Sequence, residues 1–207
     1  QIDKKKFWID TMNTELQKRT FTSIVLIFLL ALMFLYSFIM ITALIVIAII
    51  IWVEFYALIS KIIKKNKFKD KFLRFFYKAI SLLYLSLIVY LIFTIESFYP
   101  NQKIYLLYTI LVAILSDIGG LIIGKTFKGK KLTKISPNKT ISGSVGSFFF
   151  SIILIPFFYE DLIEFNFLII IIITLIISFI SQTGDLFISY MKRKAKVKNT
   201  SDMLPGH

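Results

Sequence analysis

Two aspartates interrupt long apolar runs that otherwise hold almost no charge. Asp117 lies in the run from about residue 104 to 124, and Asp185 in the run from about residue 167 to 191. A carboxylate that faces lipid at the bilayer centre costs roughly 2.5 to 3.5 kcal/mol, so an acid inside a membrane segment indicates a functional site that faces protein or water. We therefore expect both acids near the cytoplasmic boundary of the membrane, where they hold a cation.

Polar residues follow a helical spacing around Asp185. Steps of four, three, four and three residues place them within an arc of roughly 80° on one face of a helix. This stripe predicts a wet cavity that opens to the cytoplasm. Hydrogen bonding of the Ser and Gln side chains to another helix, at about 0.6 kcal/mol per contact, is an alternative left open. The stripe consists of Ser178, Gln182, Asp185, Ser189 and Lys192.

Small residues surround Asp117 and recur in the next apolar run. Ser116, Gly120 and Gly124 repeat every fourth position, and so do two pairs in the following run. This pattern allows two helix backbones to approach closely. We predict close packing of the two runs, with the second contributing Ser142 with Gly146 and Gly143 with Ser147.

A basic loop follows Gly124, with five lysines and then the sequence SPNKT at residues 136–140. Ser136, Lys139 and Thr140 offer hydroxyl groups and an ammonium, which are ligands for phosphate. Carboxylates hold the Mg²⁺ that accompanies nucleotide phosphates. The residues thus predict a metal at the acidic groups beside a loop that binds a polyphosphate, and they leave the nucleotide unidentified.

Composition defines the elements that must position these groups. The chain of 207 residues is 57% hydrophobic with a formal net charge of +13, and a bilayer core of about 30 Å needs about 20 apolar residues per helix. We predict an all-α, polytopic transmembrane bundle with about six spans, three in a region 1–97 and three in a region 98–207. The spans are two helices from Phe21 to about Ile59 with a turn near Ser37, then Phe72–Glu96, Ile104–Gly124, Ile141–Tyr159 and Phe167–Met191.

The basic residues support this layout, since 24 of the 25 Lys and Arg fall in four clusters that six spans place on one side. The positive-inside rule then puts both ends of the chain in the cytoplasm of a bacterial inner membrane. Lys103 is the exception, and the loops on its side carry Glu96, Glu160, Asp161 and Glu164. Nucleic-acid binding is not expected, because the basic residues lie at membrane boundaries without a recognition module. The absence of Cys excludes thiolate catalysis.

Three segments resemble the phosphatidate cytidylyltransferase family, also called CDP-diacylglycerol synthases. Residues 116–147, SDIGGLIIGKTFKGKKLTKISPNKTISGSVGS, resemble its block of Asp, small residues, Gly-Lys, a basic loop and Ser-Pro-x-Lys-Thr. Residues 184–194, GDLFISYMKRK, resemble its Gly-Asp-Leu and Ser-x-x-Lys-Arg segment. The final LPGH, residues 204–207, resembles the start of its Pro-Gly-His-Gly-Gly motif.

The resemblance implies a membrane enzyme that joins CTP to phosphatidic acid, with Mg²⁺ as cofactor, and releases CDP-diacylglycerol and pyrophosphate. It implies Asp185 as a metal ligand, with Asp117 as a second candidate, and catalytic roles for Asp185, Lys192 and Arg193. It also implies substrate binding by Ser136, Lys139, Thr140, Ser189 and His207.

The chain departs from the family pattern at Ile188, where a Glu is usual, and at Lys198 and Asn199, where Lys-Asp is usual. We expect a fragment truncated at both ends, because the acidic segment that follows Pro-Gly-His in the family lies beyond His207. Two alternatives stay open: a CTP-dependent transferase that acts on an isoprenoid lipid, and a membrane transporter or channel. A homodimer is also left open.

Overall fold

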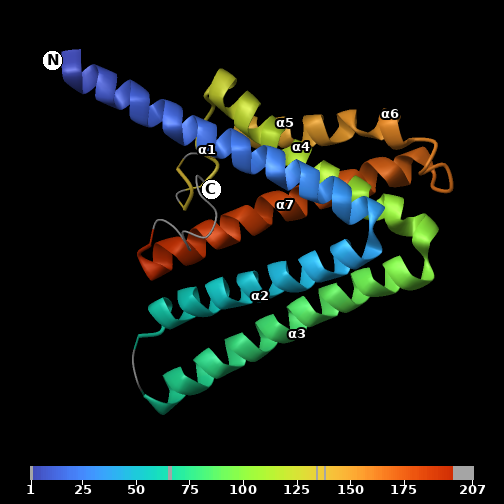
Figure 1. Cartoon of the computed structure of the whole chain (residues 1–207), viewed down its shortest axis with the longest axis horizontal. Helices are drawn as coiled ribbons and strands as arrows, with labels where there is room; N and C mark the ends of the chain where they lie inside the picture. Colours follow the sequence, from blue (N-terminus) through green and yellow to red (C-terminus); the bar gives the residue numbers. More distant parts are fainter. Residues whose placement is uncertain (1, 65–66, 134, 138, 198–207) are drawn as a thin grey trace. The chain divides into compact units, whose positions relative to one another are not determined.

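The computed structural model describes residues 2–64, 67–133, 135–137 and 139–197, and the regular elements in these ranges are helices. The predicted all-α class is therefore confirmed. In chain order the elements are α1 (Ile2–Leu35), α2 (Ser37–Ile62), α3 (Phe68–Phe98), the short η1 (Pro100–Gln102), α4 (Lys103–Phe127), α5 (Ile141–Ile153), α6 (Ile155–Phe158) and α7 (Phe167–Ala195) (Figure 1).

Helix lengths and composition confirm a polytopic membrane protein. Within the described residues, five helical segments are long and apolar enough to cross a bilayer, and a shorter apolar stretch, Thr20–Leu35, ends α1. The predicted turn near Ser37 is correct, because α1 ends at Leu35 and the extended backbone of Tyr36 separates it from α2. The five segments are Ser37–Ile62, Phe68–Phe98, Pro100–Phe127, Ile141–Phe158 and Phe167–Ala195.

One predicted span is interrupted. The sequence predicted a single helix from Ile141 to Tyr159, whereas α5 ends at Ile153 and the short α6 begins at Ile155. Pro156 explains the interruption, since proline has no N–H to donate to a carbonyl one turn earlier. The amide of Leu154 instead bonds the carbonyl of Ser151, at 3.3 Å.

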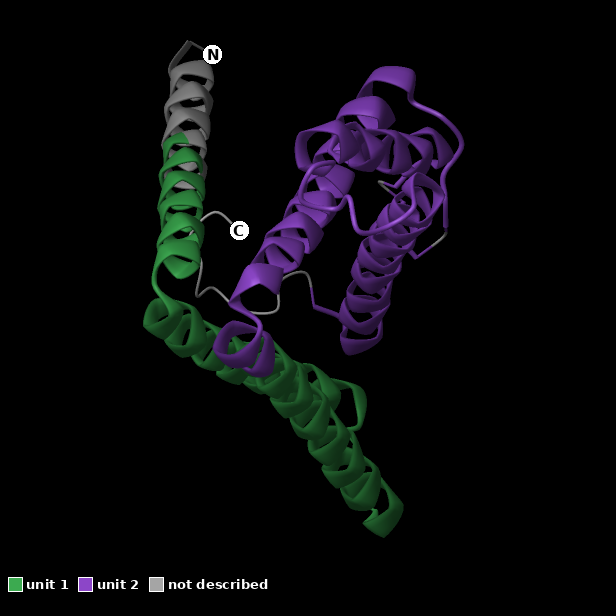
Figure 2. Ribbon diagram, turned by 90° about the vertical axis from the view of Figure 1, so that its right-hand side faces the viewer, with its two compact units in different colours: residues 1–93, 198–207 green, residues 94–197 purple. Residues whose placement is uncertain are grey.

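The described residues form two compact units, one up to residue 93 and one from 94 to 197 (Figure 2). In the first unit α1 packs against α2. The indole N–H of Trp52 on α2 donates to the carbonyl of Lys78 on α3, at 3.3 Å, and the Lys78 ammonium lies 3.3 Å from the centre of the Tyr56 ring. These contacts tie α2 to the basic part of α3.

In the second unit α4 packs against α5 and α7, and α5 also packs against α7. The buried core lies toward the end of this unit where α6 is found. There the hydroxyl groups of Tyr108 on α4 and Thr174 on α7 lie 2.5 Å apart. The core consists of Tyr108, Val112, Leu154, Ile155, Leu162 and Ile170.

Glycine allows α4 and α5 to cross at close range, as the repeated small residues predicted. A Cβ atom on Gly119 would lie 2.5 Å from the carbonyl oxygen of Gly146, and one on Gly143 would lie 2.8 Å from that of Gly120. Any side chain there would force the backbones apart. The close crossing brings the beginning of α5 against the second half of α4, beside Asp117.

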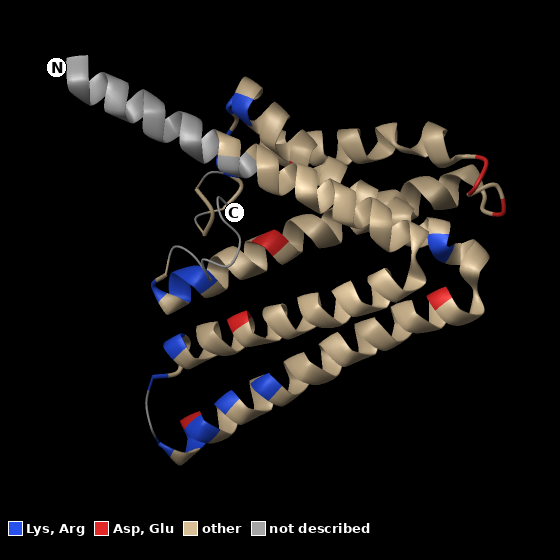
Figure 3. Cartoon of the chain, in the orientation of Figure 1, with Lys and Arg blue, Asp and Glu red and all other residues tan. Residues whose placement is uncertain are grey.

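Charge is segregated along the second unit. Basic residues gather at the α4–α5 connection and at the end of α7, while the α6–α7 connection at the opposite end carries acids (Figure 3). Lys103, the exception to the basic clustering, forms an ion pair with Glu96, with 2.7 Å between Nζ and Oε1. The two side chains are only 15% and 3% exposed. The exceptional lysine is therefore neutralised locally.

Candidate functional site

A cavity of about 470 Å³ opens between α4, α5, α7 and the loop that joins α4 to α5. Its wall combines acids, lysines and hydroxyl groups with glycines and two leucines, so it offers partners for charged groups beside apolar surface. Both predicted acids contribute to it. The lining residues are Asp117, Gly120, Leu121, Gly124, Lys125, Leu132, Lys139, Thr140, Gly143, Ser144, Ser147, Gln182 and Asp185.

The loop from Lys128 to Thr140 is tied together at its base. Lys128 ends α4 in a left-handed backbone conformation, with φ 40°, and turns the chain back. The amide of Leu132 donates to the carbonyl of Lys139, at 2.8 Å, and the amide of Ile141 donates to that of Lys130, at 2.9 Å. These backbone bonds hold Lys139 and Thr140 at the edge of the cavity.

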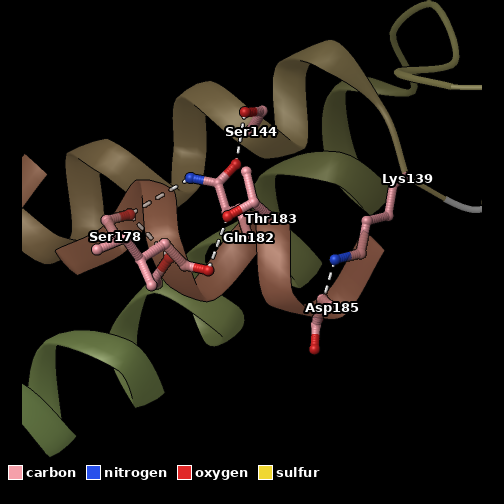
Figure 4. Close-up of polar contacts among 8 residues, drawn as sticks. Lys139, Ser144, Ser178, Gln182, Thr183 and Asp185 are labelled. Atoms are coloured by element: carbon pink, nitrogen blue, oxygen red, sulfur yellow. Dashed lines mark hydrogen bonds and ion pairs between the residues drawn. The ribbon is translucent and has the colours of Figure 1, made fainter. Parts of the chain in front are cut away.

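Lys139 and Asp185 form an ion pair across the cavity. Nζ of Lys139 lies 2.9 Å from Oδ2 of Asp185, and the two side chains point toward each other in Figure 4. They are 30% and 55% exposed. A solvent-accessible pair of this kind stabilises a fold by about 0 to 1 kcal/mol, so another ion can replace either partner at little cost.

The second acid approaches the same pair from α4. Asp117 lines the cavity together with Asp185 and Lys139, so its carboxylate interacts electrostatically with both. Within the described residues no three or more acidic or His side chains are grouped as a ready metal site. A metal held here would therefore have two carboxylates from this part of the chain, with its other oxygen ligands from water or phosphate.

Thr140 caps the beginning of α5 at the cavity wall. Its hydroxyl oxygen accepts a hydrogen bond from the amide of Gly143, at 3.0 Å, and lies 3.1 Å from the Ser142 hydroxyl. Gly143 and Ser144 in the first turn also line the cavity. The start of a helix carries partial positive charge and attracts anions, so this wall favours phosphate.

A chain of hydrogen bonds joins the three helices just inside the cavity (Figure 4). The Ser144 hydroxyl donates to Oε1 of Gln182, at 2.6 Å, and Nε2 of Gln182 donates to the Ser178 hydroxyl, at 3.3 Å. The Ser116 and Ser178 hydroxyl groups lie 2.8 Å apart and are completely buried. Interhelical bonding, the alternative for these Ser and Gln residues, is therefore what the structure contains, and Gln182 also lines the cavity.

The other candidate residues lie outside the cavity wall. Ser136 is in the turn before Lys139, where its amide donates to the Thr133 hydroxyl and its carbonyl accepts from the Lys139 amide. Ser189, Lys192 and Arg193 are on the final turns of α7, beyond Asp185. His207, with Lys198 and Asn199, lies outside the described residues.

Sequence reasoning missed four residues of the wall: Leu121, Lys125, Leu132 and Ser144. Ser144 had a usable signal, since it follows Thr140 by one helical turn and so shares its face. Lys125 was assigned only to the basic cluster. Leu132 had no signal, because its place depends on the loop closing on itself.

Fold and site together define a polytopic helical membrane protein with a charged cavity of paired acids and lysines between three helices of one unit. The sequence profile of the cytidylyltransferase family matches residues 8–207, and the chain belongs to this family. This confirms the family expected from the three motifs.

Curated relatives carry the name phosphatidate cytidylyltransferase. The chain is 39% identical to the Rickettsia typhi protein over 115 residues, covering 52% of this chain and 50% of the relative. It is 42% identical to a Staphylococcus aureus protein over 106 residues, covering 50% and 40%, and 36% identical to the Rickettsia prowazekii protein over 139 residues, covering 63% and 60%. The chain thus spans roughly half the length of these relatives. No solved structure matches it.

Proposed function

We propose that this chain contributes the nucleotide and metal site of a phosphatidate cytidylyltransferase, which transfers a cytidylyl group from CTP to phosphatidic acid. The observation that carries the proposal is the cavity in which Lys139 of the basic loop meets Asp185 of α7, with Asp117 beside them. Family membership and the names of the relatives support the choice of substrates.

The basic loop and the start of α5 form the phosphate side of the site. Lys139 and Lys125 bring ammonium groups to the cavity, and the first turn of α5 adds the partial positive charge of a helix start. Ser136 and Thr140 hold this loop and helix in place through their hydrogen bonds. Ammonium groups donate to triphosphate oxygens, and a helix start attracts their negative charge.

The end of α7 supplies further cations for the lipid phosphate. Ser189, Lys192 and Arg193 follow Asp185 along the same helix. We assign them to the phosphate of phosphatidic acid or of CTP, because arginine and lysine at a membrane boundary bind such groups strongly. His207 stays a sequence-based candidate for shaping the nucleotide loop.

The residues fit Mg²⁺. Asp117 and Asp185 offer carboxylate oxygens in one solvent-accessible cavity, which Mg²⁺ prefers, and Asp185 already holds a cation in the form of the Lys139 ammonium. Asp185 and Asp117 would hold the ion. When bound, it would supply positive charge that stabilises the phosphate oxygens and the leaving pyrophosphate.

The chain's own task is positioning. A phosphate oxygen of phosphatidic acid attacks the α-phosphorus of CTP, a new phosphorus–oxygen bond forms, and the bond from the α-phosphorus to the β-phosphate oxygen breaks. Pyrophosphate leaves with the electron pair of that bond, and no covalent enzyme intermediate is needed. Lys139 and Lys125 hold the triphosphate in line and neutralise its charge, which is how proteins promote phosphoryl transfer.

The depth of the site suits these two substrates. CTP comes from water, whereas phosphatidic acid keeps its acyl chains in the membrane, so only a cavity at the boundary reaches both. The basic ends of α4 and α7 support, by the positive-inside rule, a location of this boundary on the cytoplasmic side of a bacterial inner membrane.

The test is acceptor-dependent turnover by the full-length protein in liposomes, with labelled CTP and either phosphatidic acid or a polyprenyl phosphate. We expect CDP-diacylglycerol, and Asp185→Asn should lower its rate at least about 100-fold. Asp161→Asn is the matched control, since it removes the same charge at the opposite end of the unit. Product from the polyprenyl phosphate alone would assign the isoprenoid reaction, and near-normal turnover by Asp185→Asn would refute the role of Asp185.

A further inference from the structure

Among the described residues, the charged side chains that line the cavity are balanced in number. Two are acids, Asp117 and Asp185, and two are lysines, Lys125 and Lys139. A divalent cation that enters alone is attracted by the carboxylates and repelled by the ammonium groups. A polyphosphate that enters alone is attracted by the ammonium groups and repelled by the carboxylates. Only a ligand that carries both signs of charge, such as a metal–triphosphate complex, is complementary to the whole wall.

One acid and one lysine of this cavity, Asp185 and Lys139, are already paired with each other. The Lys139 ammonium occupies one carboxylate oxygen of Asp185 at 2.9 Å, where a metal ion would otherwise bind. The backbone bond between Lys139 and Leu132 keeps the lysine at this edge of the cavity, where only its side chain needs to move to change partner. The pair is solvent-accessible, so the lysine can be drawn away by a stronger anionic partner.

We propose that Lys139 blocks the metal-binding carboxylate of Asp185 until a nucleotide triphosphate draws its ammonium away, so that metal binding depends on the nucleotide. Phosphate oxygens and Asp185 compete for the same ammonium. When the phosphates win, the carboxylate is released beside Asp117, and both acids face the incoming cation. Metal and nucleotide then bind with positive coupling, and each tightens the other by the same factor.

This inference rests on the proposed function, because the nucleotide is taken to be CTP, yet its central test needs no nucleotide. Mn²⁺ binding to the full-length protein in neutral detergent is followed from the paramagnetic resonance signal of free Mn²⁺. Wild-type protein should bind Mn²⁺ weakly. Lys139→Met should bind it at least about fivefold more tightly, the lower end of usual coupling between sites.

Three variants distinguish the loss of the Lys139–Asp185 ion pair from the mere loss of one positive charge. Lys131→Met removes the same charge from an exposed position in the same loop and should leave Mn²⁺ affinity near the wild-type value. Lys139→Arg keeps a cation and should also resemble wild type. Lys139→Met combined with Asp185→Asn should lose the gain, because the gain acts through the freed carboxylate. Thermal unfolding of each variant checks that it is folded.

A second measurement tests how CTP binding and Mn²⁺ binding affect each other. Binding of labelled CTP is measured by dialysis with and without Mn²⁺, and Lys139→Met should weaken CTP binding while it strengthens Mn²⁺ binding. Equal or weaker Mn²⁺ affinity in folded Lys139→Met would overturn the blocking role and leave the proposed function standing. Absence of CTP binding by wild type with Mn²⁺ would overturn the proposed function and with it the coupling to CTP.

Discussion

Ser116 on α4 and Ser178 on α7 are completely buried, and their hydroxyl groups lie 2.8 Å apart. Each hydroxyl is the other's partner in an apolar setting, and Gln182 adds a second bond to Ser178. The pair therefore fixes how α4 and α7 face each other, one residue before Asp117 and two turns before Asp185. Its stability contribution is measurable independently of catalysis.

The effects of Ser116→Ala and Ser178→Ala on the free energy of unfolding should be coupled. Hydrogen bonds between membrane helices contribute about 0.6 kcal/mol on average, so the double-mutant cycle of Ser116→Ala and Ser178→Ala should give a coupling free energy near that value. Unfolding in mixed detergent micelles measures it. Strictly additive effects of the two substitutions would contradict a direct bond.

The α4–α5 crossing should not tolerate a methyl group. Gly119→Ala places a Cβ 2.5 Å from a backbone oxygen of α5 and should lower the free energy of unfolding by about 1 to 3 kcal/mol. Gly184→Ala on α7 is the matched control, because nothing lies within 4 Å of its added Cβ. The control should be neutral or more stable by up to about 1 kcal/mol, since Ala favours helix. Equal effects at both positions would contradict the close crossing.

The cap of α5 should link stability to nucleotide binding. Thr140→Ala removes the acceptor of the Gly143 amide and should cost about 1 kcal/mol in unfolding free energy. The first turn of α5 lines the cavity, so the affinity for CTP should fall with it. Thr140→Ser keeps the hydroxyl and should restore both values. Unchanged unfolding of Thr140→Ala would show that the cap is dispensable.

The natural absence of Cys allows the orientation of the second unit to be tested directly. Lys130→Cys introduces a single cysteine at an exposed position in the basic α4–α5 connection, and Glu160→Cys introduces one at an exposed position in the acidic α6–α7 connection. In cells whose outer membrane is permeabilised and whose inner membrane is intact, a membrane-impermeant maleimide should label Glu160→Cys. The same reagent should label Lys130→Cys only in inverted inner-membrane vesicles. The reverse pattern would place the cavity on the outer face.

Much of the fold could be read from the sequence because the bilayer imposes a length. The apolar run from Phe21 to Ile59 is too long for one crossing, and that excess alone located the turn that the structure has at Tyr36. Pro156 was missed as a helix break because it lies inside an unbroken apolar run. Its effect comes from a missing amide bond rather than from any change in hydrophobicity.

The site was predictable in part for the same reason. Asp117 and Asp185 stand out because charge is costly in an apolar run, and both line one cavity. The contact of Lys139 with Asp185 was beyond sequence reasoning. It requires the loop to close through backbone bonds such as Leu132 to Lys139, which almost any residue can make and which therefore leave no pattern.

The tie at the base of the α4–α5 loop limits what this segment can accept. Ser136 lies inside the closing bonds, where its amide donates to the Thr133 hydroxyl and its carbonyl accepts from the Lys139 amide. A change in the number of residues there would break these bonds and shift the lysine at the cavity edge. An affinity tag or a fluorescent label is therefore better attached at an exposed position outside the segment from Leu132 to Thr140, such as Glu160.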